Sequence, residues 1–318
     1  MTGTKIHRAA PGQRGTPQDN FASIHCLGRF MISLPRGTQV QSAYISGGAR
    51  VQTHTGVTPE DFENLLRNRE HELASTQHHD GGPMLIERYA LTDHHHVISS
   101  WWSRAGRYTQ RYNSFQYFPE HAVLFRLESQ GNATADARAE AKHTQALFGD
   151  AMQVRAAHDI PTLPGFCVER GLISGAQLNR EEVESCIRFP DMDGVTLCLK
   201  TFVTRNPETA LIERVGELPG DLGDSASGIA AVRRHPRVLG DLAGSQMILE
   251  ERVETASGYE FAWEFPGNVD SLSAPFVKFG MTVEPGALSD LGPVRGLEDA
   301  IDFWDSITGS LRLRPGAV

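Results

Sequence analysis

The sequence lacks the patterns that mark most hydrolases, nucleotide-binding proteins and membrane proteins. Its 318 residues contain no apolar run long enough to cross a bilayer as a helix. A serine hydrolase elbow requires Gly-x-Ser-x-Gly, and the nearest match, at residues 223–227, ends in serine. A zincin requires His-Glu-x-x-His, and the segment that starts at His71 has Ser75 where the second histidine belongs. No glycine-rich phosphate loop is present. The sequence therefore predicts no catalytic residue, no cofactor, no small-molecule substrate and no membrane span.

The first twenty residues lack the apolar stretch of a secretory signal. They are polar and contain several glycines and prolines, so we expect residues 1–20 to form a flexible segment. Without a signal, a complete chain of this sequence would be cytoplasmic.

Basic side chains are too few for a protein that binds nucleic acid. The net charge is −9, and phosphates require a basic surface. Residues 164–318 carry 14 lysines and arginines against 24 aspartates and glutamates, whereas residues 1–163 carry 16 against 15. Acidic loops of the second half are therefore candidate contacts for a protein partner, the alternative being that they only keep the protein soluble. The candidates are Asp191, Asp193, Glu217, Asp221 and Asp224.

Cysteine is scarce, and its spacing excludes a zinc ribbon or a dithiol redox motif. The four cysteines are Cys26, Cys167, Cys186 and Cys198, and no Cys-x-x-Cys occurs. Two strand-like segments, 183–189 and 195–203, flank a turn at residues 190–194. Cys186 and Cys198 are symmetric about this turn, so a hairpin would place them opposite each other, within reach of a disulfide. The alternative is a pair of free thiols in the core.

The order of strand-like and helix-like segments predicts an α+β fold of two related lobes. Residues 158–165 contain two prolines and a glycine, which predict a stiff, non-helical linker. We therefore expect an N-terminal lobe over residues 21–157 and a C-terminal lobe over residues 166–318. Each should have helices packed on a mostly antiparallel sheet. Among the expected elements are one strand over residues 24–35 and one helix over residues 225–234.

Histidines crowd the first half of the chain and raise the one enzymatic alternative. If residues 94–96 lie on a strand, His94 and His96 point the same way. His78 or His79 could then supply a third metal ligand from the preceding loop. The simpler interpretation is two solvated segments beside one hairpin, which predicts no metal site.

A dense aromatic stretch follows these histidines. Trp101, Trp102 and Tyr108 are interleaved with Arg104 and Arg107. Tyrosine, tryptophan and arginine are enriched at protein interfaces, and aromatic rings beside arginine also bind single-stranded nucleic acid. The acidic net charge disfavours the second interpretation. A third is that many of these rings simply face the core.

Several segments, taken in order, resemble one family of bacterial proteins. They are residues 26–30 (CLGRF), 165–173 (GFCVERGLI), 238–244 (VLGDLAG), 261–264 (FAWE), 303–305 (FWD) and 310–315 (SLRLRP). The chain resembles the immunity proteins that protect bacteria from type VI secreted phospholipase toxins, specifically the partners of the fourth class of lipase effector. The resemblance covers most of residues 22–316.

The resemblance implies a binding protein and not an enzyme. It implies two lobes arranged as a clamp, which grips a cognate lipase effector and holds its cap closed over the active site. It also implies a periplasmic location, although no export signal is visible. The competing hypothesis is a metal-dependent or otherwise unrecognised envelope enzyme that uses the histidine-rich lobe.

Overall fold

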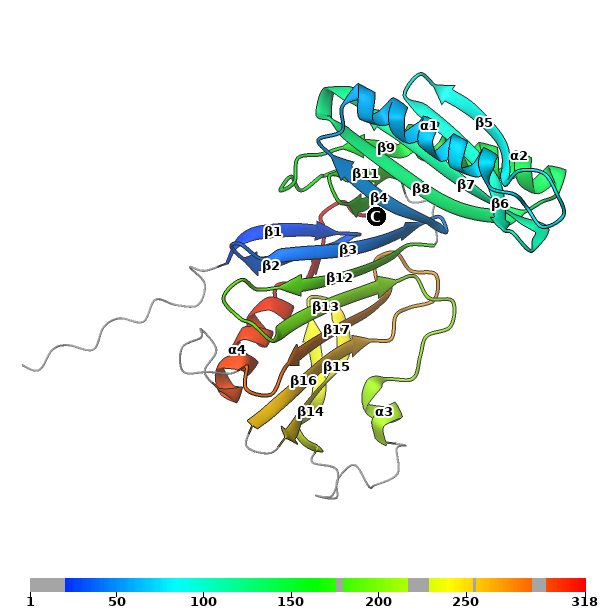
Figure 1. Ribbon diagram of the computed structural model, residues 1–318. Coiled ribbons are helices and arrows are strands. Elements are labelled where there is room, and N and C mark those ends of the chain that lie inside the picture. Colours follow the sequence, from blue (N-terminus) through cyan, green and yellow to red (C-terminus); the bar gives the residue numbers. More distant parts are fainter. Residues whose placement is uncertain (1–20, 176–179, 217–228, 254–255, 288–295) are drawn as a thin grey trace, which may run out of the picture.

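The fold is α+β, with long antiparallel strands and few helices (Figure 1). The computed structural model describes residues 21–175, 180–216, 229–253, 256–287 and 296–318. The first half forms β1 (Phe21–Leu27), β2 (Phe30–Pro35), β3 (Gln39–Ser46), β4 (Ala49–Thr55), α1 (Pro59–Ser75), β5 (Leu85–Thr92), β6 (His95–Ser103), β7 (Gly106–Phe118), β8 (Val123–Asn132), α2 (Ala135–Ala151) and β9 (Met152–Val154). The second half forms β10 (Gly165–Val168), β11 (Gly171–Ser174), β12 (Glu182–Arg188), β13 (Val195–Phe202), α3 (Leu211–Gly216), β14 (Ile229–Leu239), β15 (Leu242–Val253), β16 (Ala256–Phe265), β17 (Phe276–Val283), α4 (Leu297–Thr308) and β18 (Arg312–Leu313). No helix in these described ranges is long and apolar enough to span a membrane.

One antiparallel sheet of twelve strands runs through both halves of the chain. Its order is β14-β15-β16-β17-β13-β12-β3-β4-β8-β7-β6-β5. The halves meet in this sheet where β3 pairs with β12, with Tyr44 opposite Val183. Two smaller sheets join them again, because β18 pairs with β2 and β9 pairs with β11. The halves are thus interwoven by strand pairing as well as connected through residues 158–165.

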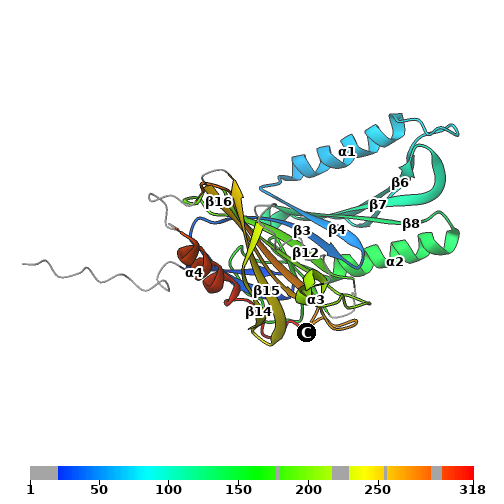
Figure 2. The same cartoon turned by 90° about the horizontal axis from the view of Figure 1, so that it is seen from below.

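The strands β4 to β8, together with α1 and α2, form what we call the sandwich lobe (residues 49–151). The two helices cover opposite faces of its sheet (Figure 2). On the α1 face, Phe62 stacks on Tyr117 of β7 within one cluster of buried apolar side chains. On the α2 face, Phe148 belongs to the main core of the molecule. Each face of the sheet is therefore closed by its own helix.

Local sequence signals explain where α1 begins. Thr58 and Asp61 form a capping box, in which each side chain accepts a hydrogen bond from the other residue's backbone amide. Pro59 stands in the first turn, where its missing amide costs nothing. Phe62 and Leu66, four residues apart, lie on the buried face of the helix.

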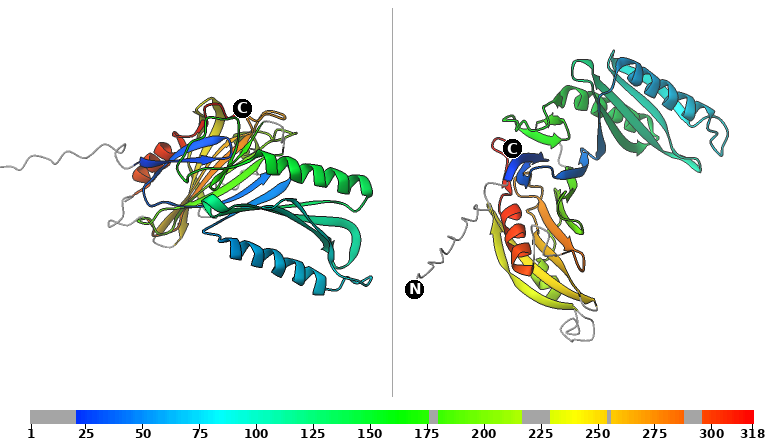
Figure 3. Two further views of the ribbon diagram at one scale, coloured as in Figure 1. Left: turned by 90° about the horizontal axis from the view of Figure 1, so that it is seen from above. Right: turned by 60° about the vertical axis from the view of Figure 1, so that its left-hand side comes forward.

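The remaining elements form the basal lobe (residues 21–48 and 152–318), to which the sandwich lobe lies at an angle (Figure 3). Its core contains Trp304 of α4 packed edge-on against Phe279 of β17. The same cluster of buried apolar side chains reaches Phe125 in the sandwich lobe. The main core is thus continuous between the lobes, which opposes independent movement of either one.

Two predicted elements are wrong. The single strand expected over residues 24–35 is a hairpin of β1 and β2, which turns at Gly28, where φ is +60° and only glycine is free of strain. The helix expected over residues 225–234 is a strand from Ile229 onward, the described part of that range. Pro236 fits β14 because this strand lies at the edge of the sheet, where one missing amide removes no central ladder bond.

Candidate functional site

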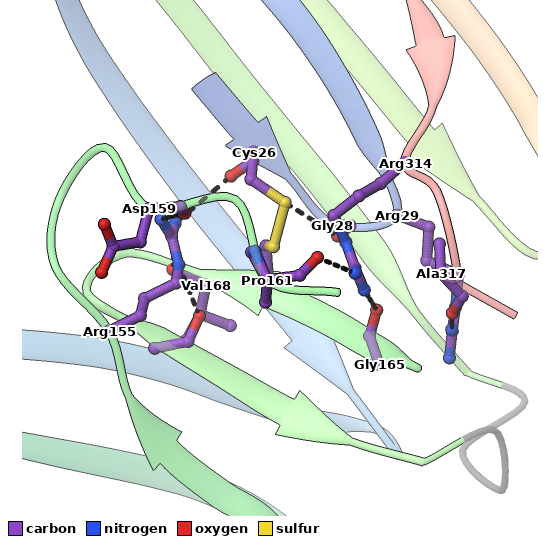
Figure 4. Close-up of a disulfide and its surroundings, with 12 residues drawn as sticks. Cys26, Gly28, Arg29, Arg155, Asp159, Pro161, Gly165, Val168, Arg314 and Ala317 are labelled. Carbon is purple, nitrogen blue, oxygen red and sulfur yellow. Dashed lines mark hydrogen bonds between the residues drawn. A yellow bond between two sulfur atoms is a disulfide. The ribbon is translucent and has the colours of Figure 1, made fainter. Parts of the chain in front are cut away.

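The two halves are fastened together in a buried junction (Figure 4). A disulfide joins Cys26 of β1 to Cys167 of β10, across a sequence separation of 141 residues. Both cysteines are buried. Beside the bridge, the backbones of Gly28 and Cys167 exchange two hydrogen bonds of 3.0 and 2.8 Å. The first strand of the first half is thereby fixed to the first strand of the second half.

Two arginines fix residues 158–165, the predicted linker. Arg155 donates to the carbonyl of Asp159 at 3.0 Å. Arg314, near the end of the chain, donates to the carbonyl of Gly165 at 2.8 Å. Burial lowers the pKa of both guanidinium groups, and the carbonyl acceptors compensate the lost hydration. The linker is therefore held by both halves and is not a free hinge.

A third arginine, Arg29, forms the one ion pair in the described residues whose two side chains are both almost fully buried. Its Nε and Nη2 atoms each lie 2.7 Å from a carboxylate oxygen of Glu181, so the pair is bidentate. Burial raises the pKa of Glu181, and the hydrogen bonds from Arg29 oppose that shift. Arg29 also donates to the carbonyls of Gly175 and Ala317. The junction thus fixes the two halves of the chain to each other within the basal lobe. Most of its buried polar atoms have partners there, whereas Arg314 Nε has none.

The histidines of the sandwich lobe do not converge on one point. His94 and His96 both contact aromatic rings on the α1 side of the sheet. His78 instead is buried against Trp101, near the other end of β6, and cannot supply a third ligand to them. Across the described residues, no group of three or more metal-ligating side chains occurs. The described residues therefore do not bring these histidines together in the way that the metal-enzyme hypothesis requires.

His95 lies on the opposite face of β6, beneath α2. Its Nε2 atom is 2.6 Å from the Ser114 hydroxyl. A methyl group at Gly149 of α2 would come within 2.5 Å of its Nδ1 atom, so this helix needs glycine there. Burial, with a smaller effect from neighbouring His96, lowers the pKa of His95 to about 4. The imidazole is neutral and part of the core.

The acidic candidates lie partly in the turn between β12 and β13. Asp191 and Asp193 are exposed there. Farther from the turn in the same hairpin, Cys186 is directly opposite Cys198, with Cα atoms 4.2 Å apart and the sulfur atoms bonded. The other three candidates, Glu217, Asp221 and Asp224, lie outside the described residues.

The hairpin of β12 and β13, with its neighbour β3, presents a polar sheet face. Along these strands buried and less buried side chains alternate, and the buried apolar ones belong to the main core. The opposite face carries Gln41, Glu184 and Arg188, all exposed, around the Cys186–Cys198 bridge. Such a face can contact a partner without any rearrangement of the core.

Two family models match the chain, one after the other. Residues 23–160 match the N-terminal domain of Tle cognate immunity protein 4. Residues 159–316 match the C-terminal domain of the same protein. The chain belongs to the Tle cognate immunity protein 4 family.

Solved structures share the fold of this family member. The apo immunity protein TplEi of the type VI secretion system from Pseudomonas aeruginosa is 22% identical, with a TM-score of 0.83 over 92% of this chain and 97% of that one. The crystal structure of a Tle4–Tli4 complex is 22% identical, with a TM-score of 0.84 over 94% and 99%. TplEi complexed with a peptide named "L" gives 21% and 0.76 over 92% and 98%. A comparison with curated protein sequences found no match.

In this member of the Tle cognate immunity protein 4 family, sequence reasoning missed the junction. One signal was present: Cys26 and Cys167 stand at equivalent places, each in the opening segment of its half. Nothing comparable marks Arg29, Arg155 and Arg314, because their acceptors are mostly backbone carbonyls, which a sequence does not distinguish from one another.

Proposed function

We propose that this protein is an immunity protein that binds and inhibits a cognate type VI secreted phospholipase. The match of both family domains across residues 23–316 carries this proposal. It is supported by the similarity of nearly the whole chain to a structure of a Tle4–Tli4 complex. The protein itself would hydrolyse no phospholipid, and its effect would depend on contact with the toxin.

The mechanism that we propose is a clamp, in which the two lobes grip the lipase and hold its cap over the active site. The twelve-stranded sheet and the main core both run through the two lobes, and they support this mechanism because they set the lobes at one angle before the partner arrives. A preorganised surface loses less conformational entropy on binding and so retains more affinity.

The two disulfides favour an oxidising compartment, and we propose that the protein is located in the periplasm.

The direct test of binding is calorimetric titration of the protein with its cognate lipase effector. We expect one binding event with a stoichiometry near one to one. Size-exclusion chromatography with light scattering should show the heterodimer. Two components that elute separately at micromolar concentration would refute the proposed function.

A further inference from the structure

The turn of the β6–β7 hairpin is a basic surface on an acidic protein. We call residues 101–111 the hairpin tip; it carries Arg104, Arg107 and Arg111. From residue 95 to residue 119 the chain contains no aspartate or glutamate, although its net charge is −9. The hairpin tip therefore has the opposite sign to the molecule as a whole.

Aromatic rings are exposed between these arginines. The side chain of Tyr108 is 86% exposed and that of Trp102 is 41% exposed. The Arg111 guanidinium lies 4.4 Å from the centre of the Trp102 ring, within range of a cation–π contact. A methyl group at Gly106 would lie 3.2 Å from the Tyr108 ring, so the ring rests against that glycine. The exposed rings are thus positioned by neighbours within the tip.

Hydrogen bonds to backbone carbonyls fasten the tip to the loop before β5. Arg104 donates from Nε to the carbonyl of Gln77 at 3.1 Å, and its own carbonyl accepts from the His79 amide at 3.0 Å. Arg107 donates to the carbonyl of Gly81. No carboxylate lies within ion-pair distance of Arg104 or Arg107 in the described part of the chain. Both guanidinium groups are oriented by neutral acceptors, so no carboxylate of the described residues competes with a partner for them.

We propose that the hairpin tip docks on an acidic patch of the lipase effector; this inference rests on the proposed function. Exposed tyrosine, tryptophan and arginine dominate the energy of protein interfaces, and an arginine fork binds a carboxylate through two parallel hydrogen bonds. Asp191 and Asp193 on the basal lobe have the opposite charge. Two contacts of opposite sign fix the orientation of the bound lipase. Nucleic acid and anionic membranes are disfavoured because only two arginines of the tip lack an ion pair in the described residues, since Arg111 pairs with Glu128, and a phosphate-binding surface needs more.

The test is a charge reversal with a matched control. The variant Arg104→Glu/Arg107→Glu should raise the dissociation constant for the lipase about 30-fold and reduce the salt dependence of association. The control Arg36→Glu/Arg67→Glu makes the same charge change at two exposed arginines elsewhere and should weaken binding less than about threefold. Equal melting temperatures for the three proteins would show that both variants are folded. The single variant Tyr108→Ala should weaken binding about tenfold without changing the charge.

Each other outcome counts against the inference in its own way. Unchanged affinity in the hairpin variant overturns the docking surface while leaving the proposed function intact. Equal losses in the variant and the control mean that only net charge matters, which also overturns it. If the wild-type protein does not bind the lipase, the proposed function fails and the inference falls with it. If the wild-type protein binds vesicles of anionic phospholipid, and the hairpin variant loses this binding but still binds the lipase, the surface contacts a membrane and the inference is overturned.

Discussion

Single buried polar residues set measurable properties of this protein. His95 is the clearest case, because it is neutral in the folded state and is protonated readily once unfolded. Its pKa is about 4 in the fold and about 6.5 in an unfolded chain. Between these values the unfolded state binds one more proton than the folded state. The contribution of His95 is therefore complete above pH 6.5 and is lost as the pH falls towards 4.

We expect His95→Gln to flatten the pH dependence of stability in that window. Without His95, the unfolded state no longer binds one proton more than the folded state. The slope of the unfolding free energy against pH therefore falls by up to about 1.4 kcal/mol per pH unit. Urea unfolding at several pH values from 4.5 to 7.5 measures this slope. Parallel curves for His95→Gln and the wild type would contradict the account.

Among the individual elements, one hairpin was predicted from the sequence, and one hairpin and one strand were not. The turn at residues 190–194 was predictable because a proline and a glycine separate two alternating runs. The β1–β2 hairpin was missed because Gly28 sits inside an apolar run with no other turn residue. The strand β14 was missed because alanine and arginine favour helices locally, while pairing with β15 decides the outcome. Local signals therefore predicted a turn where proline and glycine mark it together, and they did not predict which segments pair as strands.

The tight β1–β2 turn yields a test that separates steric clash from backbone strain. At Gly28, where φ is +60°, an added Cβ would lie 2.8 Å from Val183 Cγ2. At Gly56, where φ is +71°, nothing lies within 4 Å. Gly56→Ala should cost about 1 kcal/mol from left-handed strain alone, whereas Gly28→Ala should cost about 3 kcal/mol because a clash adds to the strain. Chemical denaturation measures both. Equal costs would show that Val183 does not constrain the turn.

The continuity of the sheet across both halves is the feature of the whole molecule that the sequence could not supply. Pairing of β3 with β12 joins residues about 140 positions apart, and no local pattern encodes such a contact. The α+β class of two lobes was predictable from the order of strand-like and helix-like segments, whereas the lobe bounds set by residues 158–165 stay a prediction. The candidate contacts Asp191 and Asp193 rest on charge alone and stay a prediction, whereas the junction was not predicted at all.

The two disulfides should contribute unequally to the stability of the whole molecule. In the chain-entropy view, a bridge across 141 residues stabilises by about 5 kcal/mol and one across 12 residues by about 3 kcal/mol. Cys26→Ala/Cys167→Ala should therefore lower the unfolding free energy more than Cys186→Ala/Cys198→Ala. The first pair should also weaken lipase binding, because it frees the junction. The opposite order of stabilities would show that the junction bridge is dispensable.

The exposed acids of the basal lobe should act on the rate of association. Long-range attraction raises that rate and is screened over about 8–10 Å by physiological salt. We expect Asp191→Lys/Asp193→Lys to slow association with the lipase several-fold and to flatten its salt dependence, with no loss of stability. The same substitutions at Asp221 and Asp224 extend the test. Surface plasmon resonance across a salt series measures the association rate. A rate that changes neither with salt nor with these substitutions would show that the acids serve solubility alone.

The central claim is that the protein inhibits a phospholipase by binding it. The most direct measurement is the hydrolysis of phospholipid vesicles by the cognate lipase at fixed concentration, with increasing amounts of this protein. We expect lipase activity to fall linearly and to reach its minimum near one equivalent, with no hydrolysis by the protein alone. Full lipase activity in the presence of a large excess of folded protein would contradict it.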